Sequence, residues 1–264
     1  MGVKSILFGV AIVSAMLPAL ALAANDDPPI DPPPPSGKLG GPSIRAWLVR
    51  AGVPDDVARF VAVVPVRETG GTFNPRVARG RAEGAPPWAR VNVDGSEAAA
   101  ALRGYERNVH KYPQGRIPAQ YTFGSGGLYG LLPSTALAGW PADDAGIVRA
   151  HPWHVLFDVA ASTASALQLV ARAWRYQAMR ERPTMVNLRR LWGGTGYLVG
   201  AAATADEEAS YAASAAKLAA ELVRAGLAGS LAEAEQLVVE PLPMYAPPPA
   251  DQLEWQLAAA LGAA

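Results

Sequence analysis

Residues 61–75 read VAVVPVRETGGTFNP. This stretch places a single acid, Glu68, at the end of an apolar run and follows it with a Gly-Gly break. A carboxyl group buried against apolar side chains loses solvation of its charged form, so we expect the pKa of Glu68 to rise. An acid with a raised pKa keeps its proton near neutral pH and can donate it to a leaving group. Glu68 is therefore the first candidate for a general acid.

The pattern of residues around this stretch predicts a mainly α fold. Pro54-Asp55-Asp56 starts a helix that runs toward Glu68, and we expect Pro65 to kink this helix or end its regular hydrogen bonding. Residues 72–87 are rich in Gly, Arg and Pro and predict a loop. The sequence has no internal repeat and no strand-period segment longer than a few residues. Further helices are expected at residues 43–51, 96–105, 134–140, 155–180, 184–192, 206–225 and 230–239 and from 251 onward.

The two ends of the chain differ in composition from its middle. Residues 1–24 combine Lys4, an apolar run and an Ala-Leu-Ala ending, which is typical of a cleaved secretory signal peptide and predicts a periplasmic or secreted location. A membrane anchor would need about 20 uninterrupted apolar residues, and Pro18 interrupts this run. We expect a Pro-rich linker at residues 25–41, one domain at 42–240, and a Pro-rich segment with a last helix at 241–264.

Charge and cysteine content exclude several classes of function. The chain has 23 basic and 23 acidic side chains, and loss of Lys4 with the first segment leaves 22 and 23. Without a basic excess, charge alone cannot hold nucleic acid or an anionic membrane, so no nucleic-acid partner is expected. The absence of cysteine excludes disulfides, and the three histidines are too dispersed for a metal motif. We therefore expect no metal and no cofactor.

Four segments of the chain resemble one known family. They are RETGGTFNP at residues 67–75, GGLYGLLPSTA at 126–136, Phe157-Asp158 at the start of an Ala-rich helix, and LWGGTG at 191–196 followed by Tyr211. In this order they are similar to blocks of the lysozyme-like lytic transglycosylase domain, the soluble lytic transglycosylase type related to goose-type lysozyme. The first block resembles the family's Glu-Ser-(Gly)-x-Phe-Asn-Pro, and the second its Gly-Leu-Met-Gln-Leu-Met-Pro-x-Thr-Ala.

The resemblance implies a fold, a substrate and a reaction. The fold would be a lysozyme-like helical domain with an irregular insertion at residues 76–125, flanked by Pro-rich tails. The substrate would be the glycan strand of peptidoglycan, with Glu68 as the sole catalytic residue, facing residues 127–130. The sugar's own 6-hydroxyl would close on the anomeric carbon and leave a 1,6-anhydro end. A monomer is expected, and a protein partner in an envelope complex stays an open alternative.

The same blocks supply candidate substrate-binding residues, which are Thr69, Gly127, Leu128, Tyr129, Trp192, Tyr197 and Tyr211. The aromatic rings are expected as groove walls, with core packing as the alternative for each, and Gly127 would let the backbone approach a sugar. The chain departs from the family at three of these positions. Thr69 replaces Ser, Tyr129 replaces Met, and no Asn follows Trp192. Gly130 also replaces the usual Gln, so a groove hydrogen bond is lost there.

Two other functions remain open from the sequence. A hydrolase would need a second carboxylate about 5 to 9.5 Å from Glu68. The candidates are Glu83, Asp94, Glu97 and Asp158, the last of which is better explained as the start of a helix. A non-catalytic domain of the same fold would bind glycan or scaffold an envelope complex without cutting it.

Overall fold

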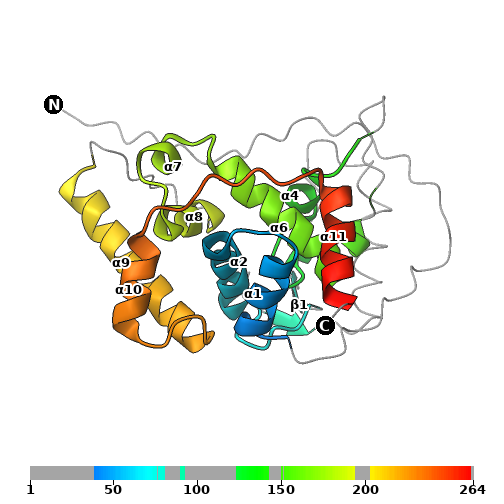
Figure 1. The fold of residues 1–264 in the computed structure, drawn as a ribbon, viewed down its shortest axis with the longest axis horizontal. Coiled ribbons are helices and arrows are strands. Elements are labelled where there is room, and N and C mark those ends of the chain that lie inside the picture. The colour runs from blue at the N-terminus through cyan, green and yellow to red at the C-terminus, as the bar shows by residue number, and fades with distance from the viewer. Residues whose placement is uncertain are drawn as a thin grey trace.

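The structure, a computed structural model, describes residues 39–75, 77–80, 90–92, 123–142, 150, 152–193 and 203–262. Helices dominate this part of the chain, which confirms the mainly α prediction (Figure 1). The first segment, most of the linker at 25–41, and the helix expected at 96–105 lie outside the described residues. The elements are α1 (Gly41–Arg50), α2 (Asp55–Glu68), β1 (Val77–Gly80), β2 (Arg90–Asn92), β3 (Phe123–Gly126), α4 (Pro133–Leu137), α5 (Pro152–Phe157), α6 (Val159–Ala173), α7 (Gln177–Glu181), α8 (Met185–Trp192), α9 (Ala205–Arg224), α10 (Leu231–Val239) and α11 (Ala250–Gly262).

Two helices, α2 and α6, form the centre of the core. Every residue of α2 from Val57 to Val66 is buried, and so is every residue of α6 from Val159 to Leu167. A helix that is apolar or small on all its faces has to be surrounded by other elements. In Figure 1, α9 and α10 lie on one side of α1 and α2, and α11 lies on the other.

Pro65 does not end α2, although the sequence suggested that it would kink the helix or end its regular hydrogen bonding. The helix continues to Glu68, and the backbone N–H of Thr69 donates to the Pro65 carbonyl at 2.8 Å. Proline removes only its own N–H donor, and the buried side chains around it hold the helix together. The acid is therefore the last helical residue, and Thr69 and the glycines after it leave the helix.

A small antiparallel sheet corrects the expectation of a loop at residues 72–87. Its strand order is β2-β1-β3, and Ala78 of β1 pairs with Gly126 of β3. Immediately after β3 the chain reverses, because Gly126 and Leu131 exchange backbone hydrogen bonds of 2.9 and 3.0 Å. Residues 127–130 form the turn between them, which we call the glycine turn.

The single helix expected at residues 155–180 is divided into α5, α6 and α7. Asp158 lies between the first two, and its carboxylate accepts a hydrogen bond of 2.8 Å from the Ala161 N–H as the N-cap of α6. A side chain that caps a new helix offers the backbone an alternative to continuing the old one. The expectation that Asp158 starts a helix is confirmed.

The C-terminal segment was expected to flank the domain, but it packs into the core. Residues 241–249, the C-terminal strap, run from α10 to α11 across the molecule (Figure 1). The Leu242 N–H donates to the Pro183 carbonyl and the Gln168 side-chain amide to the Pro248 carbonyl, both at 2.5 Å. Helix α11 then buries Leu253 and Leu257. Among the described residues, no helix is both long and apolar enough to span a membrane.

The glycine turn depends on the absence of a side chain at Gly127. Its φ is +76°, and a Cβ built there would lie 1.8 Å from the Leu156 carbonyl oxygen, so the turn and α5 pack backbone to backbone. Gly52 has a similar φ of +84° with no atom within 4 Å of a Cβ. The two positions therefore separate the cost of the backbone conformation from the cost of the contact.

Substituting Gly127→Ala is expected to destabilise the protein much more than Gly52→Ala. Gly52→Ala carries only the left-handed penalty of about 1–2 kcal/mol. Gly127→Ala adds an overpacking cost of about 1–3 kcal/mol, because the carbonyl of α5 has to move. Urea unfolding of both variants measures the difference, and equal losses would contradict the described packing.

Candidate active site

Glu68 lies where three distant parts of the chain meet. The residue is buried, with 7% of its surface exposed, at the end of α2. A Cβ built on Gly130 would lie 2.5 Å from the Glu68 Oε2 atom, so the carboxyl group rests directly against the glycine turn. This is the arrangement that the resemblance requires, in which Glu68 faces residues 127–130.

Gly130 has a physical reason to be glycine. Its φ is +61°, a conformation that residues with a side chain rarely adopt. The space that its side chain would fill is taken by the Glu68 carboxyl group. The departure from the family's Gln therefore goes together with close packing of the acid on the turn.

The third part of the chain at this point is α8, which brings Arg189 to Glu68. Arg189 is buried, with 6% exposed, and its Nη1 atom lies 3.7 Å from Glu68 Oε1. Its Nε atom lies 3.6 Å from Oε2 of Glu221 on α9. Burial lowers the pKa of Arg189, against the opposing effects of Glu221 and Glu68. The apolar run before Glu68 is thus only one part of its surroundings, since its carboxyl group also faces a guanidinium.

Arg189 and Glu221 are not among the residues predicted from the sequence. A weak signal for Arg189 was available, because α8 carries two adjacent arginines between Leu188 and Leu191 in a short amphipathic helix. Glu221 lies in a long Ala-rich helix with many charged residues, and nothing in its neighbours distinguishes it. Only the packing of α8 against α9 brings the two together.

Trp192 is the aromatic candidate that stays closest to this site. Its half-buried indole makes edge contacts with Phe60 of α2 at 6.1 Å and with Tyr129 of the glycine turn at 6.5 Å between ring centroids. Edge-to-face pairs in this range stabilise an aromatic cluster. Trp192 therefore joins α8 to the same turn that supports Glu68, while part of its ring stays accessible.

The other residues of the glycine turn belong to the core. Tyr129 and Leu128 are fully buried, and the Tyr129 hydroxyl forms a hydrogen bond of 2.9 Å with the Thr163 hydroxyl of α6. Burial also raises the pKa of Tyr129 above its ordinary value. A fully buried ring offers no face to a sugar, so the expectation that Tyr129 and Leu128 line an open groove is not met. Gly127 likewise approaches the α5 backbone and not a ligand.

Thr69 is a structural residue of the turn that follows Glu68. Its buried hydroxyl donates to the Pro65 carbonyl at 2.7 Å and accepts from the Phe73 N–H at 2.8 Å. Phe73 has a φ of +54°, which is unusual for a residue with a side chain and needs such support. Both hydrogen-bonding roles of the Thr69 hydroxyl are thus directed at the backbone, which fixes how the chain leaves Glu68.

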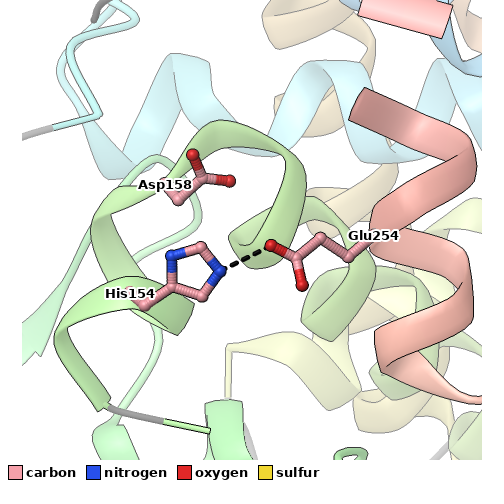
Figure 2. Close-up of side chains that lie close together, drawn as sticks. All are labelled: His154, Asp158 and Glu254. Carbon is pink, nitrogen blue, oxygen red and sulfur yellow. Dashed lines mark hydrogen bonds and ion pairs between the residues drawn. The ribbon is translucent and has the colours of Figure 1, made fainter. Parts of the chain in front are cut away.

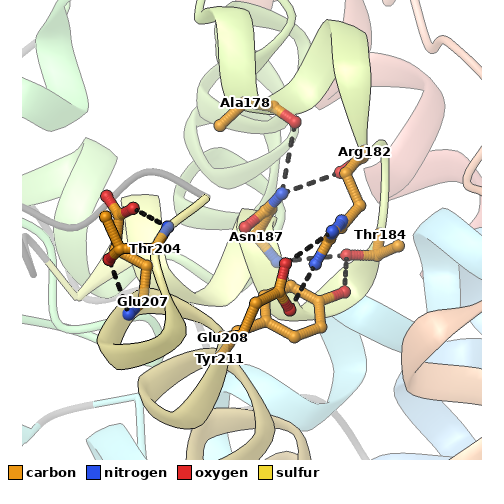
Figure 3. Close-up of polar contacts among 8 residues, drawn as sticks. All are labelled: Ala178, Arg182, Thr184, Asn187, Thr204, Glu207, Glu208 and Tyr211. Carbon is orange, nitrogen blue, oxygen red and sulfur yellow. Dashed lines mark hydrogen bonds and ion pairs between the residues drawn. The ribbon is translucent and has the colours of Figure 1, made fainter. Parts of the chain in front are cut away.

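Tyr211 lies in a polar cluster at the start of α8 (Figure 3). Its hydroxyl bonds to the Thr184 hydroxyl at 2.7 Å, and the Arg182 guanidinium lies 4.9 Å from the ring centroid. Burial raises the pKa of Tyr211, against the opposing effects of Thr184 and Arg182. Tyr211 is 7% exposed, and its ring and hydroxyl contact Arg182 and Thr184, which agrees with the core-packing alternative for this residue. Tyr197 lies outside the described residues.

Among the described residues, the carboxylate that shares a partner with Glu68 is not one of the four candidates from the sequence. Glu83, Asp94 and Glu97 lie outside the described residues. Asp158 caps α6 and lies in a cluster with His154 and Glu254, the one group of three potential metal ligands within the described part of the chain (Figure 2). The acid that shares a partner with Glu68 is instead Glu221.

The cluster of His154, Asp158 and Glu254 is better described as an ion pair than as a metal site. Its potential ligand atoms lie within 4.8 Å of one another, but His154 Nε2 already bonds to Glu254 Oε1 at 2.5 Å. Metal ligands at about 2.0–2.2 Å from one ion would be spaced more widely than this contact. The pair connects α11 to α5, and it raises the pKa of His154 against the opposing effect of burial.

A cavity of about 290 Å³ lies elsewhere, beside α6 and the chain after α4. Its lining residues are Ala138, Gly139, Trp140, Gln168, Ala171, Arg172 and Arg175. None of them belongs to the surroundings of Glu68 described above, so this cavity is not the site of the candidate acid.

Comparison with known proteins identifies no family for this chain. No protein-family model, no curated protein and no solved structure matches it.

Substituting Gly130→Ala is expected to displace the Glu68 carboxyl group while costing little more stability than Gly71→Ala. Both glycines have positive φ, but a Cβ on Gly71 meets nothing within 4 Å, whereas one on Gly130 meets Glu68. The end of a flexible side chain can move, so both variants should lose about 1–2 kcal/mol. Crystal structures of the two variants test this, and an unmoved Glu68 in Gly130→Ala would contradict the contact.

The His154–Glu254 pair predicts a pH-dependent stability. The folded state binds the His154 proton more tightly than the unfolded chain, so the pair stabilises fully below pH 6.5, the ordinary pKa of histidine. This contribution is lost as the pH rises through the raised pKa of the folded state. Because both side chains are partly exposed, at 42% and 21%, we expect at most about 1 kcal/mol.

The measurement is thermal unfolding of the wild type and of Glu254→Gln between pH 5 and 9. The Gln variant should be less stable at the acidic end, and the difference should shrink toward pH 9. The other histidines are the same in both proteins, so their contributions to the pH dependence cancel in the difference. A difference that is constant or grows with pH would contradict the pair.

Proposed function

We propose that this protein is an exported peptidoglycan lytic transglycosylase of lysozyme-like fold, with Glu68 as its catalytic residue. The observation that carries the proposal is the position of the Glu68 carboxyl group, which is buried at the end of α2 and rests on Gly130. Segments similar to the family's first, second and fourth blocks meet at this point. In the sequence these segments are far apart, and the fold brings them together.

One carboxyl group is enough for this reaction. Glu68 donates its proton to the glycosidic oxygen as the bond from that oxygen to the anomeric carbon breaks. The 6-hydroxyl oxygen of the same sugar then bonds to the anomeric carbon, and its proton returns to Glu68. The products are a free hydroxyl on one fragment and a 1,6-anhydro ring on the other, and Glu68 ends protonated as it began.

The site supports binding of an uncharged chain of sugars more than a charged ligand. Trp192 keeps a partly accessible ring next to the glycine turn, as sugar-binding aromatic residues do. The net charge of the chain is zero, so attraction of a polyanion is not the basis of binding. Of the aromatic residues predicted to line the groove, Trp192 is the one that we propose to contact the glycan.

A hydrolase remains the second candidate because Glu221 supplies a carboxylate. Glu68 and Glu221 both contact the planar guanidinium of Arg189, so their nearest oxygens lie within about 10 Å of each other. Hydrolases of this chemistry separate their two carboxyl groups by roughly 5–9.5 Å. Reducing ends among the products would favour this candidate, whereas anhydro ends favour the transglycosylase.

The test is release of glycan fragments from purified peptidoglycan by the wild type and by Glu68→Gln. Loss of general acid catalysis should lower the rate about 10²- to 10⁴-fold, with the folded state unchanged by circular dichroism. Glu235→Gln, an exposed acid on α10, is the matched control and should keep full activity. An unchanged rate in Glu68→Gln would refute the assignment. Binding without cutting by the wild type would favour the non-catalytic scaffold.

A further inference from the structure

Arg189 is buried in a way that its packing alone does not explain. Its Nη1 and Nη2 atoms are inaccessible to solvent and have no hydrogen-bond partner among the described residues. Two carboxylates flank the guanidinium, but at 3.7 and 3.6 Å they lie beyond ordinary hydrogen-bond lengths. Arg59 also leaves one nitrogen, Nε, without a partner in the described part of the chain, but at Arg189 both Nη atoms depend on the two carboxylates alone, which is a costly way to bury a cation.

The orientation of the guanidinium connects Glu68 to Glu221. The group is planar, so its direction is fixed once one edge is held. Its Nε edge faces Glu221 on α9, and its Nη1 atom faces Glu68 on α2. Glu221 thus lies on the side of Arg189 from which it can aim the cation at Glu68, although it is far from Glu68 along the chain.

We propose that Arg189 is a positioning residue for the Glu68 carboxyl group and that Glu221 limits how strongly Arg189 acts on it. Arg189 holds the carboxyl group against Gly130 by attraction. Glu221 shares the same cation, so that the full positive charge does not act on Glu68 alone. One arginine between two acids can hold Glu68 in place while its positive charge is divided between them. The role in catalysis rests on the proposed function, whereas the electrostatic coupling of the three groups does not.

The other charged groups near Arg189 do not replace this arrangement. Arg67 is exposed on the last turn of α2, and its positive charge lowers the pKa of Arg189, an effect that ranks between the opposing charge effects of Glu221 and Glu68. Arg190, the next residue of α8, turns toward α9 and donates to the Ser210 and Ser214 hydroxyls at 3.1 and 3.2 Å. Among the described residues, the buried charges that face Arg189 are Glu68 and Glu221.

During the proposed reaction this arrangement acts in both steps. When Glu68 gives its proton to the glycosidic oxygen, the new carboxylate is left next to the Arg189 guanidinium, which stabilises it. When the 6-hydroxyl proton moves to Glu68, that carboxyl group becomes neutral, and the Arg189 guanidinium is then balanced by Glu221. Glu68 is the protein group that gives up and regains a proton, and Arg189 acts on it without touching the sugar.

The decisive experiment titrates the Glu68 carboxyl group by NMR in protein labelled with ¹³C at the glutamate carboxyl position, with the signal assigned through Glu68→Gln. Glu221→Gln removes a negative charge and should lower the pH at which Glu68 titrates. Arg189→Met removes the cation and should raise it. Each shift should correspond to about a tenfold or larger change in proton affinity. Glu208→Gln is the matched control. Glu208 lies on α9 as Glu221 does, but it pairs with Arg182 at the surface, so its substitution should leave the titration of Glu68 unchanged.

Each variant has a second readout that a purely structural role would not move. Arg189→Lys keeps the charge but not the planar fork, so it should preserve the titration of Glu68 and lower kcat. Glu221→Gln is nearly isosteric, so it decides the proposal even if Arg189→Met fails to fold. Shifts of the same sign, or no shift in Glu221→Gln, would overturn the proposal, as would loss of stability with an unchanged titration.

The two proposals fail separately. If Glu68→Gln keeps full activity, the assigned reaction is wrong, but the titrations still show whether the three groups are coupled. If the titrations do not shift while Glu68→Gln is inactive, the coupling is wrong and the reaction stands.

Discussion

The contact between the Glu68 carboxyl group and the bare backbone of Gly130 constrains the rest of the structure. An acid at the end of a buried helix can only turn inward if something opposite it leaves space, and Gly130 leaves it by having no side chain. That glycine is held by the pairing of Gly126 with Leu131 and by the close approach of Gly127 to α5. Helices α2 and α5 and the small sheet are therefore fixed relative to one another around a single carboxyl group.

The three buried arginines show that this point differs from the rest of the core. Arg59 donates to the Leu227 carbonyl and to Asp55, and Arg190 donates to two serine hydroxyls. Both are joined to their neighbours by hydrogen bonds, although the Nε atom of Arg59 has no partner among the described residues. Arg189 differs because neither of its Nη atoms makes a hydrogen bond among the described residues, and its guanidinium faces two carboxylates instead. Structures keep such costly arrangements mostly at sites where chemistry or binding requires them.

Local signals in the sequence were sufficient for most helix ends but not for the site. The caps at Thr184 and Ser230 and the start at Pro54 were predicted correctly, because a cap depends only on its nearest neighbours. The strands at β1 and β3 were missed, since they are short and pair with residues far away in the sequence. Glu68 was found from its own neighbours, whereas Arg189 and Glu221 were not, because only the packing of three helices gives them their roles. For Tyr129 and Tyr211 the sequence left core packing open beside a groove wall, and both rings are buried, since composition does not tell a core ring from a groove wall.

The C-terminal strap and α11 affect the order in which the chain can complete its core. The indole N–H of Trp47, in the first helix, donates to the Leu257 carbonyl at 2.7 Å, across 210 residues of sequence. The strap has to cross α8 and α6 before α11 can reach this position. The helix that carries Trp47 therefore completes its packing only after α11 has been synthesised, so these contacts cannot form while the chain is still growing.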